Sequence, residues 1–126
     1  MEFILSATVT LVTLGIYLGA LANVSKVRAK TDTWGPATSG SFELECAIRS
    51  QTNLTEHLVM FFPLLWLCAW LNSDLVAALL GSLFPAGRIL YARYYPTGHR
   101  TGFLIQLGSE ISLFLAVSIG LVSVVL

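Results

Sequence analysis

Four polar residues in the first half of the chain are spaced so that they would share one side of a helix. Glu45, Arg49, Asn53 and Glu56 follow one another at intervals of four, four and three residues, close to the turn of about 3.6 residues in an α-helix. Arginine pairs with carboxylates, glutamate can hold an ammonium group, and asparagine both donates and accepts hydrogen bonds. This polar stripe therefore favours an amino-acid-like anion as its ligand.

A second polar face follows some forty residues later. Arg88, Tyr91 and Tyr95 are again at helical spacing, and Arg100 lies just beyond the turn Pro96-Thr97-Gly98-His99. If the ligand carries a thiol, an adjacent arginine would favour its thiolate form. The two faces together predict a pocket for a small charged ligand, in apolar surroundings that would admit a lipophilic second substrate.

The composition places these faces in a membrane protein. Of 126 residues, 56% are hydrophobic and 11% charged, whereas charged residues make up about 25% of a typical soluble domain. The net charge is zero, so nucleic acid is not an expected partner. Neither a Cys-x-x-Cys motif nor a Cys/His cluster with metal-ligand spacing occurs, and we expect no metal.

Four apolar segments are long enough to cross a bilayer, which takes about 20 helical residues. They cover residues 3–25, 42–71, 75–95 and 101–126. The short connections between them predict an all-α, antiparallel four-helix transmembrane bundle in a single domain, residues 1–126. Pro63 is tolerated within a membrane helix. A cleavable signal peptide is disfavoured, because Glu2 replaces the usual basic start and the first apolar run is too long.

The basic residues give the bundle an orientation. All of them fall at or near the first and third connections: Lys26, Arg28, Lys30, Arg49, Arg88, Arg93 and Arg100. The positive-inside rule then places these two connections in the cytoplasm, with both termini on the opposite side.

Charged residues inside a span cost about 2.5–3.5 kcal/mol each and usually face a bundle interior, so we expect the polar stripe to point inward. An alternative is a salt-bridge ladder that only fixes helix register, with Glu45 paired to Arg49 and Glu56 to an arginine of another span. His57 is interpreted as a packed or interfacial histidine. Glu110 is the deepest charge, and the sequence predicts no partner for it.

Three motifs carry a family resemblance over nearly the whole chain: Glu45-x-x-x-Arg49-x-x-x-Asn53-x-x-Glu56, Phe61-Phe62-Pro63 and Gly87-Arg88-x-x-Tyr91-x-x-x-Tyr95. They resemble those of the membrane-associated proteins in eicosanoid and glutathione metabolism, the MAPEG family, and most of all its short bacterial-type members. The resemblance implies a homotrimer with glutathione bound between subunits near the cytoplasmic face. It favours a bacterial inner membrane over the endoplasmic reticulum.

The resemblance also implies roles for individual residues. Tyr91 and Tyr95 would reach glutathione from a neighbouring subunit, and Lys26 is an alternative to Arg28 at the end of the first span. Arg100 is similar in position to an arginine that activates the thiol, and is the expected catalytic residue. The expected glutathione-binding residues are Arg28, Arg49, Asn53, Glu56, Arg88, Tyr91 and Tyr95.

The function implied is that of a glutathione transferase or peroxidase acting on lipophilic electrophiles or hydroperoxides. Thr52 and His57 depart from the eicosanoid-producing members, so their specificities are not transferred. Two alternatives remain: a non-catalytic, lipid-binding member of the same family, and a small membrane transporter that uses the polar stripe as an ion path. Only Glu110 favours the transporter.

Overall fold

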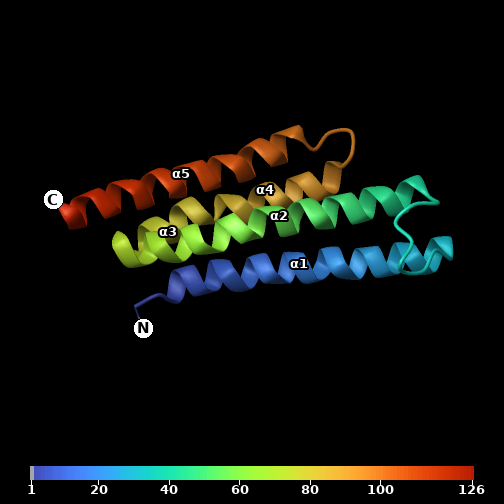
Figure 1. The fold of residues 1–126 in the computed structure, drawn as a ribbon, viewed down its shortest axis with the longest axis horizontal. Helices are drawn as coiled ribbons and strands as arrows, with labels where there is room; N and C mark the ends of the chain where they lie inside the picture. The colour runs from blue at the N-terminus through green and yellow to red at the C-terminus, as the bar shows by residue number, and fades with distance from the viewer. Residues whose placement is uncertain (1) are drawn as a thin grey trace.

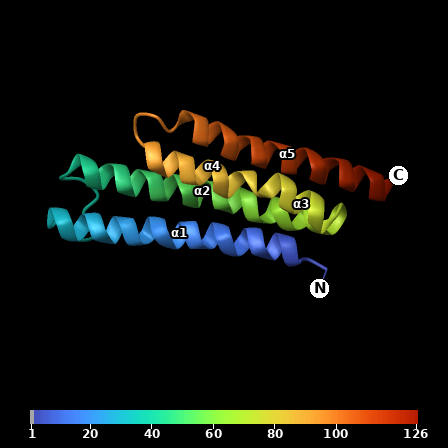
Figure 2. The same ribbon diagram turned by 180° about the vertical axis from the view of Figure 1, so that it is seen from behind.

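The computed structural model describes residues 2–126 and confirms an all-helical transmembrane bundle (Figure 1). Its helices are α1 (Ile4–Thr31), α2 (Phe42–Leu71), α3 (Asp74–Gly81), α4 (Leu83–Tyr94) and α5 (Arg100–Val125). Helices α3 and α4 together form one span, so four segments are long and apolar enough to cross a membrane. Successive spans run antiparallel, and both termini lie at the same end of the bundle (Figure 2).

Two boundaries differ from those expected. The third span is not continuous, because α3 ends at Gly81 and α4 begins at Leu83. Pro85 has no backbone N–H to donate to the carbonyl of Gly81, which weakens the helix at this point. Helix α1 continues past residue 25 to Thr31, where Asp32 ends it in a left-handed conformation with a φ of 49°.

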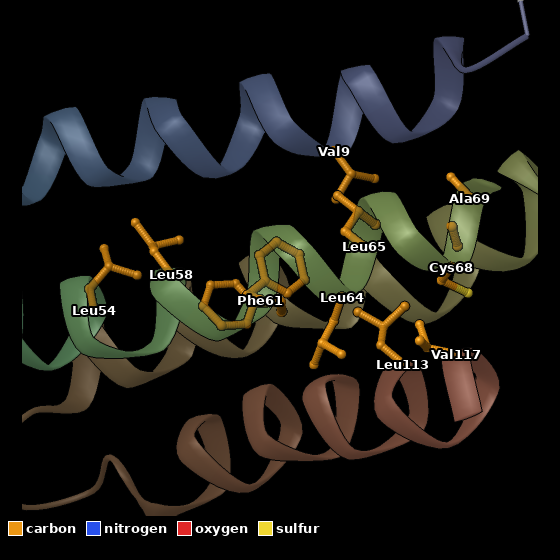
Figure 3. Close-up of a cluster of buried hydrophobic side chains, with 12 residues drawn as sticks. Val9, Leu54, Leu58, Phe61, Leu64, Leu65, Cys68, Ala69, Leu113 and Val117 are labelled. Atoms are coloured by element: carbon orange, nitrogen blue, oxygen red, sulfur yellow. The ribbon is translucent and has the colours of Figure 1, made fainter. Parts of the chain in front are cut away.

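The hydrophobic core runs along the inward face of α2. Leu54, Leu58 and Phe61 are buried there, and the helix continues through Pro63 without interruption (Figure 3). The ring of Phe61 stacks on that of Phe84 in α4, with 4.0 Å between centroids. Lipid tails are as apolar as these side chains, so close van der Waals packing between them, and not their removal from water, holds the spans together around α2.

The end of the bundle that carries the termini is held by hydrogen bonds between helices. The carboxylate of Asp74, the first residue of α3, accepts the backbone N–H groups of Leu5 and Ser6, each at 2.8 Å. These groups are unpaired donors at the start of α1, so the negative side chain caps that helix. Asn72 donates to the carbonyl oxygen of Ala116 at 3.1 Å and thereby fixes α5 to the same end.

The opposite end gathers the basic residues, as expected from the sequence. Lys26, Arg28 and Lys30 lie in the last turns of α1, and Arg100 begins α5. The other three arginines are Arg49 in the first half of α2 and Arg88 and Arg93 in α4, the helix that leads to this end (Figure 1). Placement of this end in the cytoplasm stays a prediction.

Helices α4 and α5 approach one another until their backbones touch. A Cβ at Gly87 would lie 2.6 Å from the backbone nitrogen of Gln106, and one at Gly102 would collide with the amide of Tyr91. Only glycine fits at these two positions. Their close packing holds Tyr91 against the first turn of α5.

Glu110 has a partner that the sequence did not predict. Its two carboxylate oxygens lie 2.8 and 3.0 Å from Nδ1 of His57, which joins α5 to α2. The side chain of Glu110 is 1% exposed and that of His57 16%. His57 also packs edge-on against Phe103, with 5.8 Å between ring centroids, so the interpretation of His57 as a packing residue was incomplete.

We predict that this pair stabilises the bundle mainly by keeping the buried carboxylate partnered. His57→Leu should lower the free energy of unfolding by about 3 kcal/mol, because it leaves an uncompensated charge in the apolar interior. The double variant His57→Leu/Glu110→Leu should recover part of this loss. Unfolding of the detergent-solubilised protein by sodium dodecyl sulfate measures both. A double variant less stable than His57→Leu would contradict the prediction.

Candidate functional site

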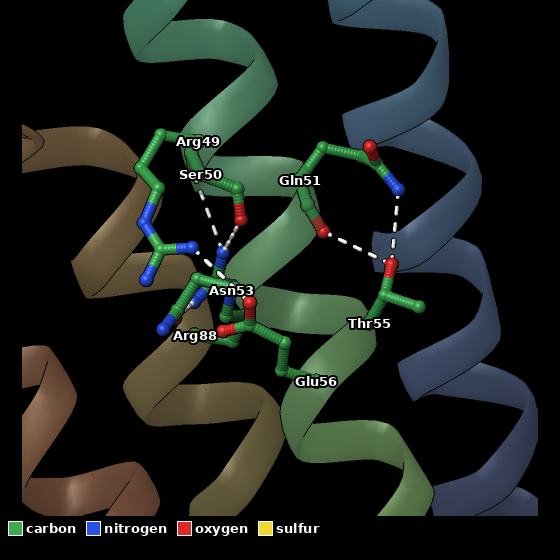
Figure 4. Close-up of polar contacts among 7 residues, drawn as sticks. All are labelled: Arg49, Ser50, Gln51, Asn53, Thr55, Glu56 and Arg88. Atoms are coloured by element: carbon green, nitrogen blue, oxygen red, sulfur yellow. Dashed lines mark hydrogen bonds and ion pairs between the residues drawn. The ribbon is translucent and has the colours of Figure 1, made fainter.

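The polar stripe lies on the outer surface of the single chain. Arg49 and Glu56 form an ion pair at 3.1 Å, and their side chains are 57% and 52% exposed (Figure 4). Glu45 is also exposed. The expectation that the stripe points inward is therefore wrong for one chain, because the inward face of α2 carries apolar residues. The alternative of a salt-bridge ladder paired Glu45 with Arg49 and Glu56 with an arginine of another span. The observed pairing differs from it, because Arg49 pairs with Glu56.

Asn53 is the member of the stripe that reaches the interior, and it does so by binding Arg88. The guanidinium of Arg88 donates to Oδ1 of Asn53 at 2.8 Å and to the backbone carbonyl and the hydroxyl of Ser50 (Figure 4). It also lies 3.5 Å from Oε1 of Gln106 in α5. Arg88 is 1% exposed, so these oxygens replace water around its charge. The amide oxygen of Asn53 is thus occupied, while its N–H groups are left for a ligand.

The second polar face continues from Arg88 into three rings in mutual contact, here called the aromatic ladder: Tyr91, Tyr95 and His99. The guanidinium of Arg88 lies 4.1 Å from the centroid of Tyr91, a cation–π contact. Tyr91 and Tyr95 are stacked at 5.2 Å, and the His99 ring lies 5.1 Å from each of them. The buried arginine therefore anchors a cluster of three rings, one of which is an imidazole.

The stripe and the ladder enclose one cleft of about 330 Å³, here called the polar cleft. This volume is at the lower end of the range of roughly 300–1,000 Å³ for small-molecule sites. A cationic, an amide and two phenolic groups converge there, a set suited to a small carboxylate-bearing ligand. Its lining residues are Arg49, Asn53, Tyr91, Tyr95, Pro96, His99 and Phe103. A single chain thus brings together residues from both faces.

A second cleft, of about 480 Å³, lies between α1, α2 and α4 and is here called the α1-side cleft. Its lining is mostly apolar and includes Ile16, Ala20 and Leu54. Tyr95 lines both clefts, and Ser50 and Arg88 also contribute to this one. The two clefts therefore lie on either side of the same tyrosine.

Other residues expected at the site lie apart from the polar cleft. Arg28 donates to the carbonyl oxygens of Thr33 and Ala37, at 3.1 and 2.7 Å, and so holds the α1–α2 loop. Arg100 is exposed at the start of α5 and is not among the described residues that line the cleft. Glu56 is connected to it only through its ion pair with Arg49.

Sequence reasoning missed His99 as a site residue and the pairing of Arg88 with Asn53, Ser50 and Gln106. His99 lies in the turn between α4 and α5, where helical spacing no longer applies, so periodicity carried no signal for it. Gln106 reaches Arg88 from the antiparallel helix α5. The Ser50 carbonyl is a backbone group and had no sequence signal.

Comparison with known proteins identifies the family. The sequence profile described as the MAPEG family matches residues 5–121. An uncharacterized protein of Synechocystis is 38% identical over 117 residues, which cover 92% of this chain and 85% of the relative. Mouse microsomal glutathione S-transferase 2 is 33% identical over 88 residues, which cover 68% of this chain and 60% of the mouse protein. The chain is thus a four-span integral membrane protein that belongs to the MAPEG family.

Proposed function

We propose that the protein is a glutathione-dependent membrane enzyme that conjugates lipophilic electrophiles or reduces lipophilic hydroperoxides. The observation that carries the proposal is the convergence of Arg49, Asn53, Tyr91 and Tyr95 on one cleft. Family membership and the similarity to a glutathione S-transferase agree with it.

Glutathione carries carboxylates and an ammonium group, and the Arg49–Glu56 pair offers a partner for each. The exposed guanidinium of Arg49 would bind a carboxylate, and Glu56 would bind the ammonium group. The N–H groups of Asn53 and the phenols of Tyr91 and Tyr95 would complete the contacts, while Arg88 holds Asn53 and Tyr91 in place.

The remaining roles concern an assembly of several copies. Arg28 and Arg100 are exposed or half-exposed at the basic end of the bundle, where a homotrimer would bring them toward a neighbouring subunit's glutathione. Arg100 would then stabilise the thiolate by its charge. This end would face the cytoplasm of a bacterial cell, with both termini across the inner membrane.

The lipophilic second substrate would bind in the α1-side cleft. This cleft is mostly apolar and lies between membrane-spanning segments, so it is open to compounds dissolved in the bilayer. It is also the larger of the two clefts, which favours a non-catalytic lipid-binding protein as the second candidate. The transporter loses its main support, because Glu110 is bound to His57 in the bundle interior.

Mixing purified protein with glutathione should produce the ultraviolet absorbance of a thiolate near neutral pH, because the arginines of the site favour the anionic sulfur. The same preparation should conjugate glutathione to a chloronitrobenzene or reduce an organic hydroperoxide. Absence of both thiolate and turnover would overturn the proposal. Lipid binding without turnover would support the second candidate.

The arginines should differ in their kinetic effects. Arg49→Ala should weaken glutathione binding by about tenfold or more, because a charge-assisted hydrogen bond contributes about 1.5–3 kcal/mol. Arg100→Ala should lower kcat more than it raises the Kd for glutathione, as expected for a group that stabilises the thiolate.

Arg93→Ala is a suitable control, because Arg93 lies on the ring of Tyr94 and outside the polar cleft. Titration calorimetry and steady-state kinetics would measure Kd and kcat for all three variants. An Arg100→Ala protein with unchanged kcat would remove that residue from the mechanism.

A further inference from the structure

We propose that His99 is the base that accepts the thiol proton of glutathione in the polar cleft. This inference rests on the proposed function and adds a catalytic residue to it. His99 lines the cleft together with Arg49, Asn53 and the two tyrosines. Of the seven described lining residues, it is the one whose side chain can exchange a proton near neutral pH.

The hydrogen bonds of the ring determine which nitrogen is available. Nδ1 of His99 lies 2.8 Å from the carbonyl oxygen of Pro96. A carbonyl only accepts, so Nδ1 carries the hydrogen and donates it. In the neutral ring Nε2 then has a free lone pair, and it makes no hydrogen bond within residues 2–126. Nε2 is therefore the atom that can take a proton from a ligand.

The aromatic ladder fixes the position of this base. The His99 ring lies 5.1 Å from both Tyr91 and Tyr95, at interplanar angles of 72° and 54°. Tyr91 is in turn held by the buried guanidinium of Arg88. A ring held on two sides and bound at Nδ1 has little freedom to leave the cleft, which is what a positioned base requires.

The transfer breaks the S–H bond of glutathione and forms an N–H bond at Nε2, giving a thiolate and an imidazolium. The charged and titratable groups nearest the ring are Arg49 from α2, Tyr91 from α4 and Tyr95 just after α4. Arg88 acts on them through its contact with Tyr91, and Arg100 follows His99 in the chain. Arg49 attracts the thiolate, and the thiolate in turn attracts the imidazolium. Proton transfer is thereby coupled to glutathione binding.

Activation by arginine alone differs from this mechanism in where the proton goes. A guanidinium stays protonated in proteins and cannot accept the thiol proton. If Arg100 acted without a base, each thiolate formed would release one proton to the solvent. With His99 as the base, the proton stays in the cleft.

The test measures thiolate and released protons together. Purified full-length protein is mixed with glutathione slightly above neutral pH, in weak buffer containing a pH-indicator dye, while thiolate absorbance is recorded. The wild type should release clearly fewer than one proton per thiolate. A wild-type ratio of one would overturn the inference and leave the proposed function standing, whereas absence of thiolate and turnover would remove the proposed function itself.

The variant His99→Asn separates the two ring nitrogens. The asparagine amide can still donate to Pro96 from about the place of Nδ1, but nothing replaces Nε2. We expect turnover near neutral pH to fall by about a hundredfold and to recover partly at higher pH, with little change in the Kd for glutathione. In this variant, each thiolate that still forms should release one proton to the solvent. If His99→Asn kept the turnover and the proton release of the wild type, His99 would only shape the turn and the inference would be wrong.

His57→Asn is the matched control. It is the same substitution at the other histidine, keeps an amide donor toward Glu110, and lies outside the residues described as lining the polar cleft. Its ratio of protons to thiolate should equal that of the wild type. A ratio that changed in His57→Asn and not in His99→Asn would assign the proton to His57 and overturn the inference.

Discussion

The buried guanidinium of Arg88 is the group on which the polar end of the molecule depends. A charge 1% exposed inside a membrane bundle must be surrounded by oxygen atoms, and these come from Ser50 and Asn53 in α2 and from Gln106 in α5. Satisfying one charge therefore aligns three spans. The π face of Tyr91 completes the shell and starts the aromatic ladder, so the geometry of the polar cleft follows from the solvation of Arg88.

The sequence was sufficient to predict the spans and most of the polar cleft, because both depend on periodicity. Apolar runs of membrane length gave the helices, and helical spacing placed Arg49 with Asn53 and Tyr91 with Tyr95. The predicted inward direction of the polar stripe was wrong for a single chain. Spacing shows which residues share a face of a helix, but it does not show which part of the protein or solvent that face contacts. The break between Gly81 and Leu83 was not predicted, because a membrane helix can also continue through a proline, as α2 does at Pro63. The pairing of His57 with Glu110 depends on contacts between helices, which one-dimensional patterns do not contain.

The family and the structure contribute different parts of the functional argument. Membership in the MAPEG family and similarity to a glutathione S-transferase indicate glutathione as the class of ligand. The structure contributes a cleft that is lined in one chain by residues from α2, α4 and the start of α5, and the proposed function assigns the ligand to it. Within that cleft, the residue that we propose as the proton acceptor is His99, whereas the sequence pointed only to Arg100 as the catalytic residue.

Tyr95 lines the polar cleft on one side and the α1-side cleft on the other. In the proposed function it would separate a water-soluble ligand from one delivered by the bilayer, and among the described residues the two clefts share no other lining residue. Residues of α1 such as Ile16 and Ala20 border only the apolar compartment. The range of lipophilic compounds accepted could thus diverge between relatives, or be redesigned, through α1 while the polar compartment and its arginine stay unchanged.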